Sequence, residues 1–591
     1  MRTLDGTEAS TSFHKRKKAE AKKNAGGNSL LRGFSQLLSL DGDWGGGGGE
    51  TPLGEDEKEA EARAVRCVDA CRVDEVFADS KFLESDSLTH MVGALVRAAG
   101  GKPAVPGGEE GAEGADTAVS APPSDVDGDA AVFCLDVLIA VTLRNRDRVR
   151  VALPHVYALL RQLVQQAKTP SPLAERAIFE VVRLARRLLP YKDDLSDELL
   201  DSLRLMFALE PAVADAFLER IVRELDALVR ECADSVHGAK GWETVCKLLM
   251  ASARHPDAAV HGFNALRTIV EGAISNYAEK QKEPDATNTA DADANGHTPA
   301  SEGAEGADTA VTLTRGAHHL RPWNVRSCVE AIGAFVDAHE GGDDRSVGAV
   351  DLLGLVAGAV DGWCGGNADG GAMATAAANT MGWDATTYPN AANSTTEAIN
   401  ALRVEMTSSV WASIVSTLKR VGETEERPAV RDDAVLTLQR VLLASDGLNA
   451  PATHWMAVTV GVLMPMLEAL GERVRLARGE QKVFAERTAR LGVSCAAKAF
   501  LQYLPAMLTT ATPPQFAAAW AKVLERNAQV LKHARSEELQ EAVPEAVKNM
   551  LLVMSAQGVL APGAPEGIWE TTWKKAAAID PGLTPAIVGA K

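Results

Sequence analysis

The chain has 591 residues, of which 46% are hydrophobic but only 5% aromatic, and its formal net charge is −19. This composition suits closely packed helices better than β-sandwiches, whose strands favour aromatic and β-branched side chains. An acidic chain repels the phosphate backbone, which argues against nucleic-acid binding. Eight scattered cysteines lack the density of a secreted disulfide scaffold and are typical of a reducing compartment.

The first 60 residues are poor in hydrophobic side chains and contain the glycine run Gly45–Gly49. We expect most of residues 1–60 to be disordered, because they bury too little apolar surface to offset the entropy of ordering. One segment near residues 30–40 has the spacing of a short amphipathic helix, which either packs on the folded region or binds a partner. Its apolar residues are Leu30, Phe34, Leu37 and Leu38.

A basic cluster lies within residues 1–60. It consists of Lys15, Arg16, Lys17, Lys18, Lys22 and Lys23. Next to an anionic bilayer each such charge contributes about 1 kcal/mol, so the cluster is a weak candidate for binding a membrane surface. A nuclear localisation signal and a solvated charge run are the alternatives.

Membrane insertion is not expected from the apolar stretches. The N-terminus lacks the apolar core of a secretory signal. The longest apolar stretch, residues 455–467, has about 13 residues and contains Pro465, whereas a membrane-spanning helix needs about 20. We therefore expect a cytoplasmic chain whose membrane contact is peripheral.

Helical periodicity runs through most of the chain and is interrupted by segments rich in Gly, Ala, Asp or Pro. Two of these segments share the decapeptide EGAEGADTAV, at 110–119 and 302–311, and we interpret both as low-complexity inserts. The expected organisation is a helical array over 61–276 with an insert at 100–129, an acidic linker at 277–315, repeats at 316–363, a flexible loop at 364–396, C-terminal repeats at 397–580 and a tail at 581–591.

The segment Gly241–Leu266 is the clearest repeat unit in this array. Two short amphipathic helices are predicted to meet at Pro256, which cannot continue the first of them. Asp257 is expected in the first turn of the second helix, where a carboxylate faces exposed N–H groups. The apolar faces are Val245, Leu248 and Leu249 in the first helix and Val260, Phe263 and Leu266 in the second. A helix, a proline turn and an antiparallel helix predict an all-α solenoid of the HEAT, armadillo or TPR type.

A second turn, between residues 427 and 434, reads RPAVRDDA and resembles the turn of a HEAT repeat. In that repeat the arginine usually pairs with an acidic residue of a neighbouring repeat, which here makes Arg431 the candidate. Asp432 or Asp433 is expected in the N-terminal turn of the following helix.

The sequence contains no phosphate-binding loop, nucleophile elbow or HExxH motif. Cys67 and Cys71 have the spacing to share a helix face, but no second Cys or His pair follows at the spacing of zinc ligands. We therefore predict no catalytic residue, no cofactor and no metal site.

Several longer runs stand out along the chain, at Arg32–Asp41, Asp79–Leu88, Ala131–Arg148, Arg186–Leu203, Gly241–Leu266, Asp344–Gly354, Arg427–Gly447, Lys548–Leu560 and Trp569–Trp573. In sequence and in order they resemble the region downstream of the catalytic domain in the large Golgi-type ARF guanine-nucleotide exchange factors, the GNOM-like, brefeldin-A-resistance class. The resemblance covers nearly everything from about Arg32 to Trp573 outside the inserts.

The resemblance implies a regulatory, partner-binding solenoid in Golgi vesicle transport, peripheral at Golgi membranes. The family's exchange domain inserts a glutamate beside the nucleotide, but its FRLPGE-like motif does not occur in this sequence. The partners it implies are ARF- or Rab-type small GTPases, or Golgi coat and tether proteins. A generic HEAT-like scaffold or adaptor unrelated to ARF signalling is the alternative.

Overall fold

The computed structural model describes residues 73–101, 128–236, 238–280, 319–339, 342–364, 404–445 and 452–589, with isolated positions between 59 and 72. Within these ranges the regular secondary structure is entirely helical. The chain forms two compact units, Met1–Leu248 and Leu249–Lys591. The prediction of an all-α solenoid of helix pairs is confirmed.

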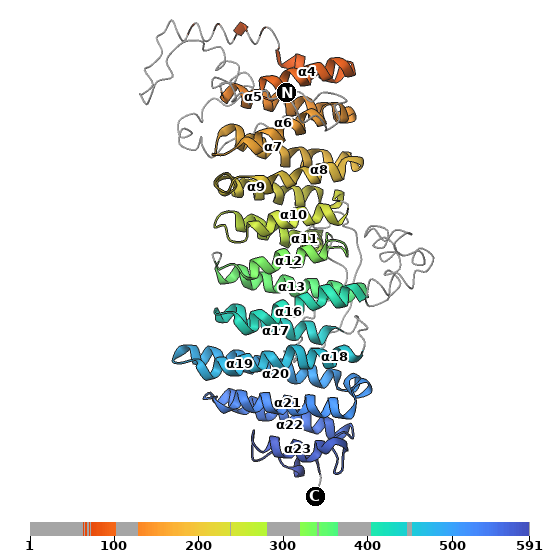
Figure 1. Ribbon diagram of the computed structural model, residues 1–591, viewed down its shortest axis with the longest axis vertical. Helices are drawn as coiled ribbons and strands as arrows, with labels where there is room; N and C mark the ends of the chain where they lie inside the picture. Colours follow the sequence, from red (N-terminus) through yellow and green to blue (C-terminus); the bar gives the residue numbers. More distant parts are fainter. Residues whose placement is uncertain are drawn as a thin grey trace, which may run out of the picture. The chain divides into compact units, whose positions relative to one another are not determined.

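The N-terminal unit is built from short antiparallel helices stacked in chain order (Figure 1). Helices α5, α7 and α9 lie side by side in one layer, and α4 and α6 pack against that layer. The bounds are α3 Val73–Ala78, α4 Ser85–Ala98, α5 Gly128–Arg144, α6 Leu153–Gln166, α7 Pro172–Leu188, α8 Ser196–Ser202 and α9 Pro211–Cys232. Helix α10, Ala239–Ala251, follows and includes the unit boundary.

The C-terminal unit has the same two-layer plan. Helices α13, α17, α20 and α22 are successive neighbours in one layer, and α16, α19, α21 and α23 in the other. The bounds are α11 Ala258–Lys280, α12 Val325–Val336, α13 Asp343–Cys364, α16 Ala412–Thr424, α17 Pro428–Ala444, α18 Ala452–Val458, α19 Met464–Leu476, α20 Glu480–Thr510, α21 Pro513–Lys532, α22 Glu537–Ala556 and α23 Ile568–Ala576.

Proline and side-chain caps mark where several of these helices begin. Pro172, Pro428 and Pro513 each occupy the start of a helix, where the missing N–H costs nothing because that position has no helical acceptor. Thr512 and Gln515 form a capping box at the start of α21. The sequence therefore encodes helix starts locally, whereas the pairing of helices depends on their apolar faces.

The helix pair predicted at 241–266 is present, with its break at residues 252–257, but two details of the prediction are wrong. Asp257 precedes α11, and the imidazole Nδ1 of His255 accepts the N–H of Asp257 at 3.3 Å and of Ala258 at 3.1 Å. The histidine thus satisfies the backbone donors that we expected the aspartate to face. Val260 is 47% exposed, because the buried face of α11 runs through the adjacent Ala259 instead.

The expectation that no apolar segment is long enough to span a membrane is wrong for three helices. Residues 343–364, 453–476 and 480–510 each form a helix long and apolar enough, by length and composition, to cross a membrane. The second exceeds the predicted stretch because it continues past Pro465, the second residue of α19, which begins just after the π-helical segment Thr459–Leu463. In the fold, 44%, 50% and 56% of their apolar windows are buried inside the protein. Much of their hydrophobicity therefore packs against neighbouring helices.

Candidate functional site

The basic cluster and the run Arg32–Asp41 lie outside the described residues, as do both copies of the decapeptide. Cys67 is exposed, and Cys71 is outside the described positions. The part of the chain that the structure describes contains no group of three or more His, Cys, Asp or Glu that could hold a metal ion. These sequence predictions therefore remain predictions.

The turn before α17 joins its repeat to the preceding one. The Arg427 guanidinium donates to both carboxylate oxygens of Glu425, at 3.1 and 2.9 Å. It also donates to the Ser346 hydroxyl of α13 at 2.9 Å and to the Val336 carbonyl at the end of α12 at 3.1 Å. Burial raises the pKa of the Glu425 carboxyl, but the hydrogen bonds from Arg427 outweigh it and lower that pKa to about 2. Arg427 is therefore a charged link between repeats.

The prediction for Arg431 is right about its neighbour and wrong about its partner. Arg431 is 1% exposed, and its Nε donates to the Thr488 hydroxyl of α20 at 3.0 Å rather than to a carboxylate. Asp432 supplies the charged contact with α20, through Arg487 at 3.1 Å, and also accepts a hydrogen bond from Thr488. A hydroxyl thus bridges the adjacent Arg and Asp, which fixes the register of α17 on α20.

Buried ion pairs perform a similar role in the N-terminal unit. Arg186 of α7 donates to Glu224 of α9 at 3.0 Å, and both side chains are more than nine-tenths buried. Arg176 contacts Glu180 at 3.2 Å and also pairs with Asp136 of α5. Burial raises the pKa of the Asp136 carboxyl to about 6. The positive charge of Arg176 lowers that pKa but does not outweigh the burial. These contacts hold three helices of one layer in register.

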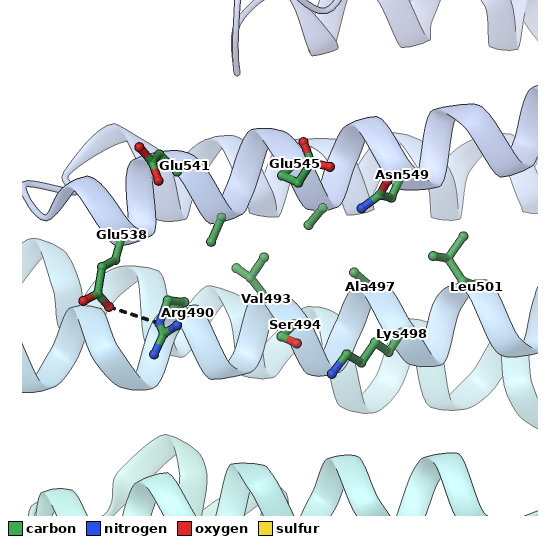
Figure 2. Close-up of a pocket in the computed structure, with 12 residues that line it drawn as sticks. Arg490, Val493, Ser494, Ala497, Lys498, Leu501, Glu538, Glu541, Glu545 and Asn549 are labelled. Carbon is green, nitrogen blue, oxygen red and sulfur yellow. Dashed lines mark ion pairs between the residues drawn. The ribbon is translucent and has the colours of Figure 1, made fainter. Parts of the chain in front are cut away.

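A groove with a volume of about 540 Å³ lies between α20 and α22. Figure 2 shows small side chains at its centre and charged ones along both helices. We call it the α20–α22 groove. It is lined by Arg490, Val493, Ser494, Ala497, Lys498 and Leu501 of α20 and by Glu538, Glu541, Ala542, Glu545, Ala546 and Asn549 of α22.

The two walls of the α20–α22 groove carry opposite charge. Its α22 wall presents three glutamates, and its α20 wall presents Arg490 and Lys498. Arg490 and Glu538 form an ion pair at 3.5 Å across one end (Figure 2). Among the described residues, no other ion pair crosses the groove, so Glu541, Glu545 and Lys498 face it without a partner on the opposite wall.

Polar contacts also join other neighbouring helices of this layer. Arg440 of α17 pairs with Asp351 of α13 at 2.8 Å. Gln502 of α20 donates to the Leu443 carbonyl of α17 at 2.9 Å. The α20–α22 groove is lined in part by Ala497 and Ala546, whose side chains are too short to reach across it. The cavity therefore results from small residues placed between charged walls.

The groove is lined by charged, amide and apolar side chains and by one hydroxyl group. Ser494 is its only hydroxyl, and its nearest described partner is the Gln439 side-chain oxygen at 3.4 Å rather than a base that could activate it. These residues were not predicted from the sequence, because only the spacing of Glu538, Glu541 and Glu545 along one helix face indicates them. Nothing in that spacing reveals which helix lies opposite.

Comparison with known proteins gives a consistent set of relatives. Residues 411–583, which include the α20–α22 groove, match the model of the GBF1-like tetratrico peptide repeat region. The chain is 32% identical to the ARF guanine-nucleotide exchange factor GNL1 of Arabidopsis thaliana over 93% of its length, and 32% identical to GNOM of the same plant over 92%.

A third relative is the Golgi-specific brefeldin A-resistance guanine nucleotide exchange factor 1 homolog of Caenorhabditis elegans. It is 34% identical over 32% of this chain, a stretch that represents 9% of the worm protein. The chain spans about a third of the length of GNL1 and of GNOM, 32% in each case. The similarity therefore covers nearly all of this chain but a minor part of the plant proteins.

Proposed function

We propose that this chain, which belongs to the family of the GNOM-like ARF guanine-nucleotide exchange factors, is a regulatory and partner-binding solenoid that acts in vesicle transport at the Golgi. The similarity to GNL1 over 93% of the chain is the observation that carries this proposal. The match to a GBF1-like repeat region supports it from a second direction.

The proposed role is non-catalytic. The sequence has no FRLPGE-like motif, and in the family to which it belongs that motif carries the glutamate of the exchange reaction. The described helices instead form stacked pairs with a groove of binding character. Stacked helix pairs build extended surfaces that recognise other macromolecules.

The proposed partners are ARF- or Rab-type small GTPases, or coat and tether proteins of the Golgi. Their recruitment would place a cytoplasmic chain at the membrane surface, with help from the basic cluster between Lys15 and Lys23. GNL1 and GNOM are ARF guanine-nucleotide exchange factors, and the worm relative is the homolog of a Golgi-specific exchange factor.

The test is the location of the fluorescently tagged full chain in cells. We expect it to coincide with a Golgi marker and to disperse when Golgi membranes lose ARF-GTP. A control with the tag alone accounts for passive distribution. A chain that is spread through the cytosol or concentrated in the nucleus under both conditions would favour the alternative, a generic HEAT-like adaptor.

A further inference from the structure

The α20–α22 groove has the dimensions of a seat for a short helix. Its lining residues recur every three or four positions, from Arg490 to Leu501 on one helix and from Glu538 to Asn549 on the other. Each of these spans covers about three helical turns, or roughly 16 Å at 1.5 Å per residue. The lining therefore forms one continuous trough parallel to both helices, as Figure 2 shows.

A helical ligand suits this trough better than an extended one. An extended peptide leaves its backbone N–H and C=O groups in need of partners, and it usually finds them at the edge of a sheet. The described part of the unit has no strand to offer such an edge. A helix satisfies its own backbone hydrogen bonds, and the floor of Val493, Ala497, Ala542 and Ala546 allows its surface to approach closely.

The charges specify what such a helix carries. Glu541 and Glu545 are one turn apart on one wall, and Lys498 lies on the other. Glu545 also pairs with Lys548 on its own helix, at 3.5 Å. This pair competes only weakly with a basic residue of the ligand, because exposed ion pairs contribute little free energy. A ligand with basic residues along one edge and acidic residues along the other meets complementary charge on both walls.

We infer that the α20–α22 groove binds an amphipathic helix of a partner protein, about three turns long, with Lys or Arg along one edge, Asp or Glu along the other and small aliphatic residues facing the floor. The inference deepens the proposed function by naming the chemistry of the partner, and it rests on that function for the partner's cellular setting. The groove lies within the segment that matches the family's repeat region.

The experiment uses two synthetic helical peptides and the purified full chain. In the first peptide, lysines and glutamates occupy separate edges beside an alanine–valine face. In the second, of identical composition, they alternate along both edges. We expect the first to bind at least about tenfold more tightly by fluorescence anisotropy, equivalent to about 1.4 kcal/mol, and to weaken as salt is raised.

Two variants and one control locate the binding. Glu541→Lys reverses a wall charge and Ala546→Trp fills the groove, and each should weaken binding of the first peptide about tenfold or more. Glu330→Lys makes the same charge change at an exposed position in α12 and should leave binding unchanged. Circular dichroism of each variant verifies that the helices remain folded.

The inference is overturned if neither peptide binds, if both bind equally, or if folded Glu541→Lys and Ala546→Trp retain full affinity. It is also overturned if sedimentation shows that the chain dimerises and that Ala546→Trp makes it monomeric, because the occupant would then be a second copy. Peptide binding does not depend on the Golgi. If the chain is dispersed in cells but binds the peptide, only the proposed transport role is refuted. If the chain locates to the Golgi but does not bind the peptide, only the inference about the groove is refuted.

Discussion

At the scale of single residues, the buried tryptophans show how one side chain serves both packing and polar satisfaction. Trp242 is 2% exposed, and its indole N–H donates to the Val236 carbonyl at 3.0 Å. Trp411 and Trp520 are 1% exposed and donate to the hydroxyls of Ser445 and Thr572. Burial of these rings contributes several kcal/mol only because the N–H group also finds an acceptor.

Replacement of Trp242 by alanine should lower the free energy of unfolding by about 3–5 kcal/mol, because it removes the ring, leaves a cavity and frees the Val236 carbonyl. Chemical denaturation monitored by circular dichroism measures the loss. Trp569→Ala is the matched control, since Trp569 is only half-buried, and it should cost clearly less. An unchanged melting temperature for Trp242→Ala would contradict the described burial.

The tryptophans were predictable from the sequence because amphipathic spacing places them on apolar faces. The exposure of Val260 and the position of Asp257 were not predictable, because both depend on the residue at which α11 begins. A shift of one residue turns a helix by about 100°, which moves Val260 from the buried face to the surface. The local signal of Pro256 locates the break between the helices without fixing that residue.

At the scale of helices, the turn of Glu425 and Arg427 ties α17 to the preceding pair. Glu425 Oε1 accepts the N–H of Glu426 at 2.8 Å and of Arg427 at 2.9 Å, in addition to the guanidinium. The carboxylate form is therefore favoured in the folded state. Its charge helps to orient Arg427 toward the ends of α12 and α13.

This arrangement predicts a pH-dependent contribution to stability. The folded pKa of Glu425, about 2, lies below its ordinary value of 4.5, so the contribution is fully present above about pH 4.5. It is lost as pH falls from there through about 2, because the unfolded chain then binds the proton more readily. Glu425→Gln should accordingly cost about 1–3 kcal/mol at pH 7 and progressively less at lower pH.

Urea denaturation of the wild type and Glu425→Gln between pH 7 and pH 3 measures this difference. Glu472→Gln is a suitable control, because Glu472 is exposed and its pair with Arg475 lies within one helix. A difference between wild type and Glu425→Gln that stays constant over this range would mean that the carboxylate charge does not stabilise the turn.

Helix pairing explains how far the candidate site could be foreseen. Pro428 predicted where α17 begins, and the arginine after it predicted a contact between repeats. The prediction that Asp432 or Asp433 lies in the first turn is wrong, because α17 already begins at Pro428 and both aspartates lie beyond that turn. The α20–α22 groove depends on Ala497 and Ala546, about 50 residues apart in the sequence, lining the same cavity. Local periodicity carries no information about that juxtaposition, and alanines on a helix face are compatible with a closed interface as well as an open one.

At the scale of the whole molecule, the family membership was available from the sequence because the similar runs are spread in order along the chain. The 32% identity to GNL1 over 93% of the chain confirms that assignment. The basic cluster between Lys15 and Lys23 was equally visible, but its role depends on what surrounds it. A net charge of −19 opposes the approach of the rest of the chain to an anionic membrane.

We therefore expect weak binding of the full chain to liposomes that contain anionic lipid. Six basic residues contribute only a few kcal/mol, and that attraction is screened when salt shortens the Debye length. Flotation should detect binding that falls with rising salt and disappears when residues 1–30 are deleted. Binding that survives both high salt and this deletion would point to an apolar insertion surface among the described helices instead.

The last prediction concerns nucleotide exchange itself. We expect the purified chain not to accelerate nucleotide release from an ARF GTPase, because no FRLPGE-like motif supplies the glutamate that acts in the family's exchange reaction. The measurement follows a fluorescent nucleotide leaving the GTPase as the chain is titrated, with a known exchange domain as the positive control. Acceleration that increases with chain concentration would assign exchange activity to the helical repeats. If release stays at its intrinsic rate while the helical peptide binds, this chain recognises a partner without accelerating exchange.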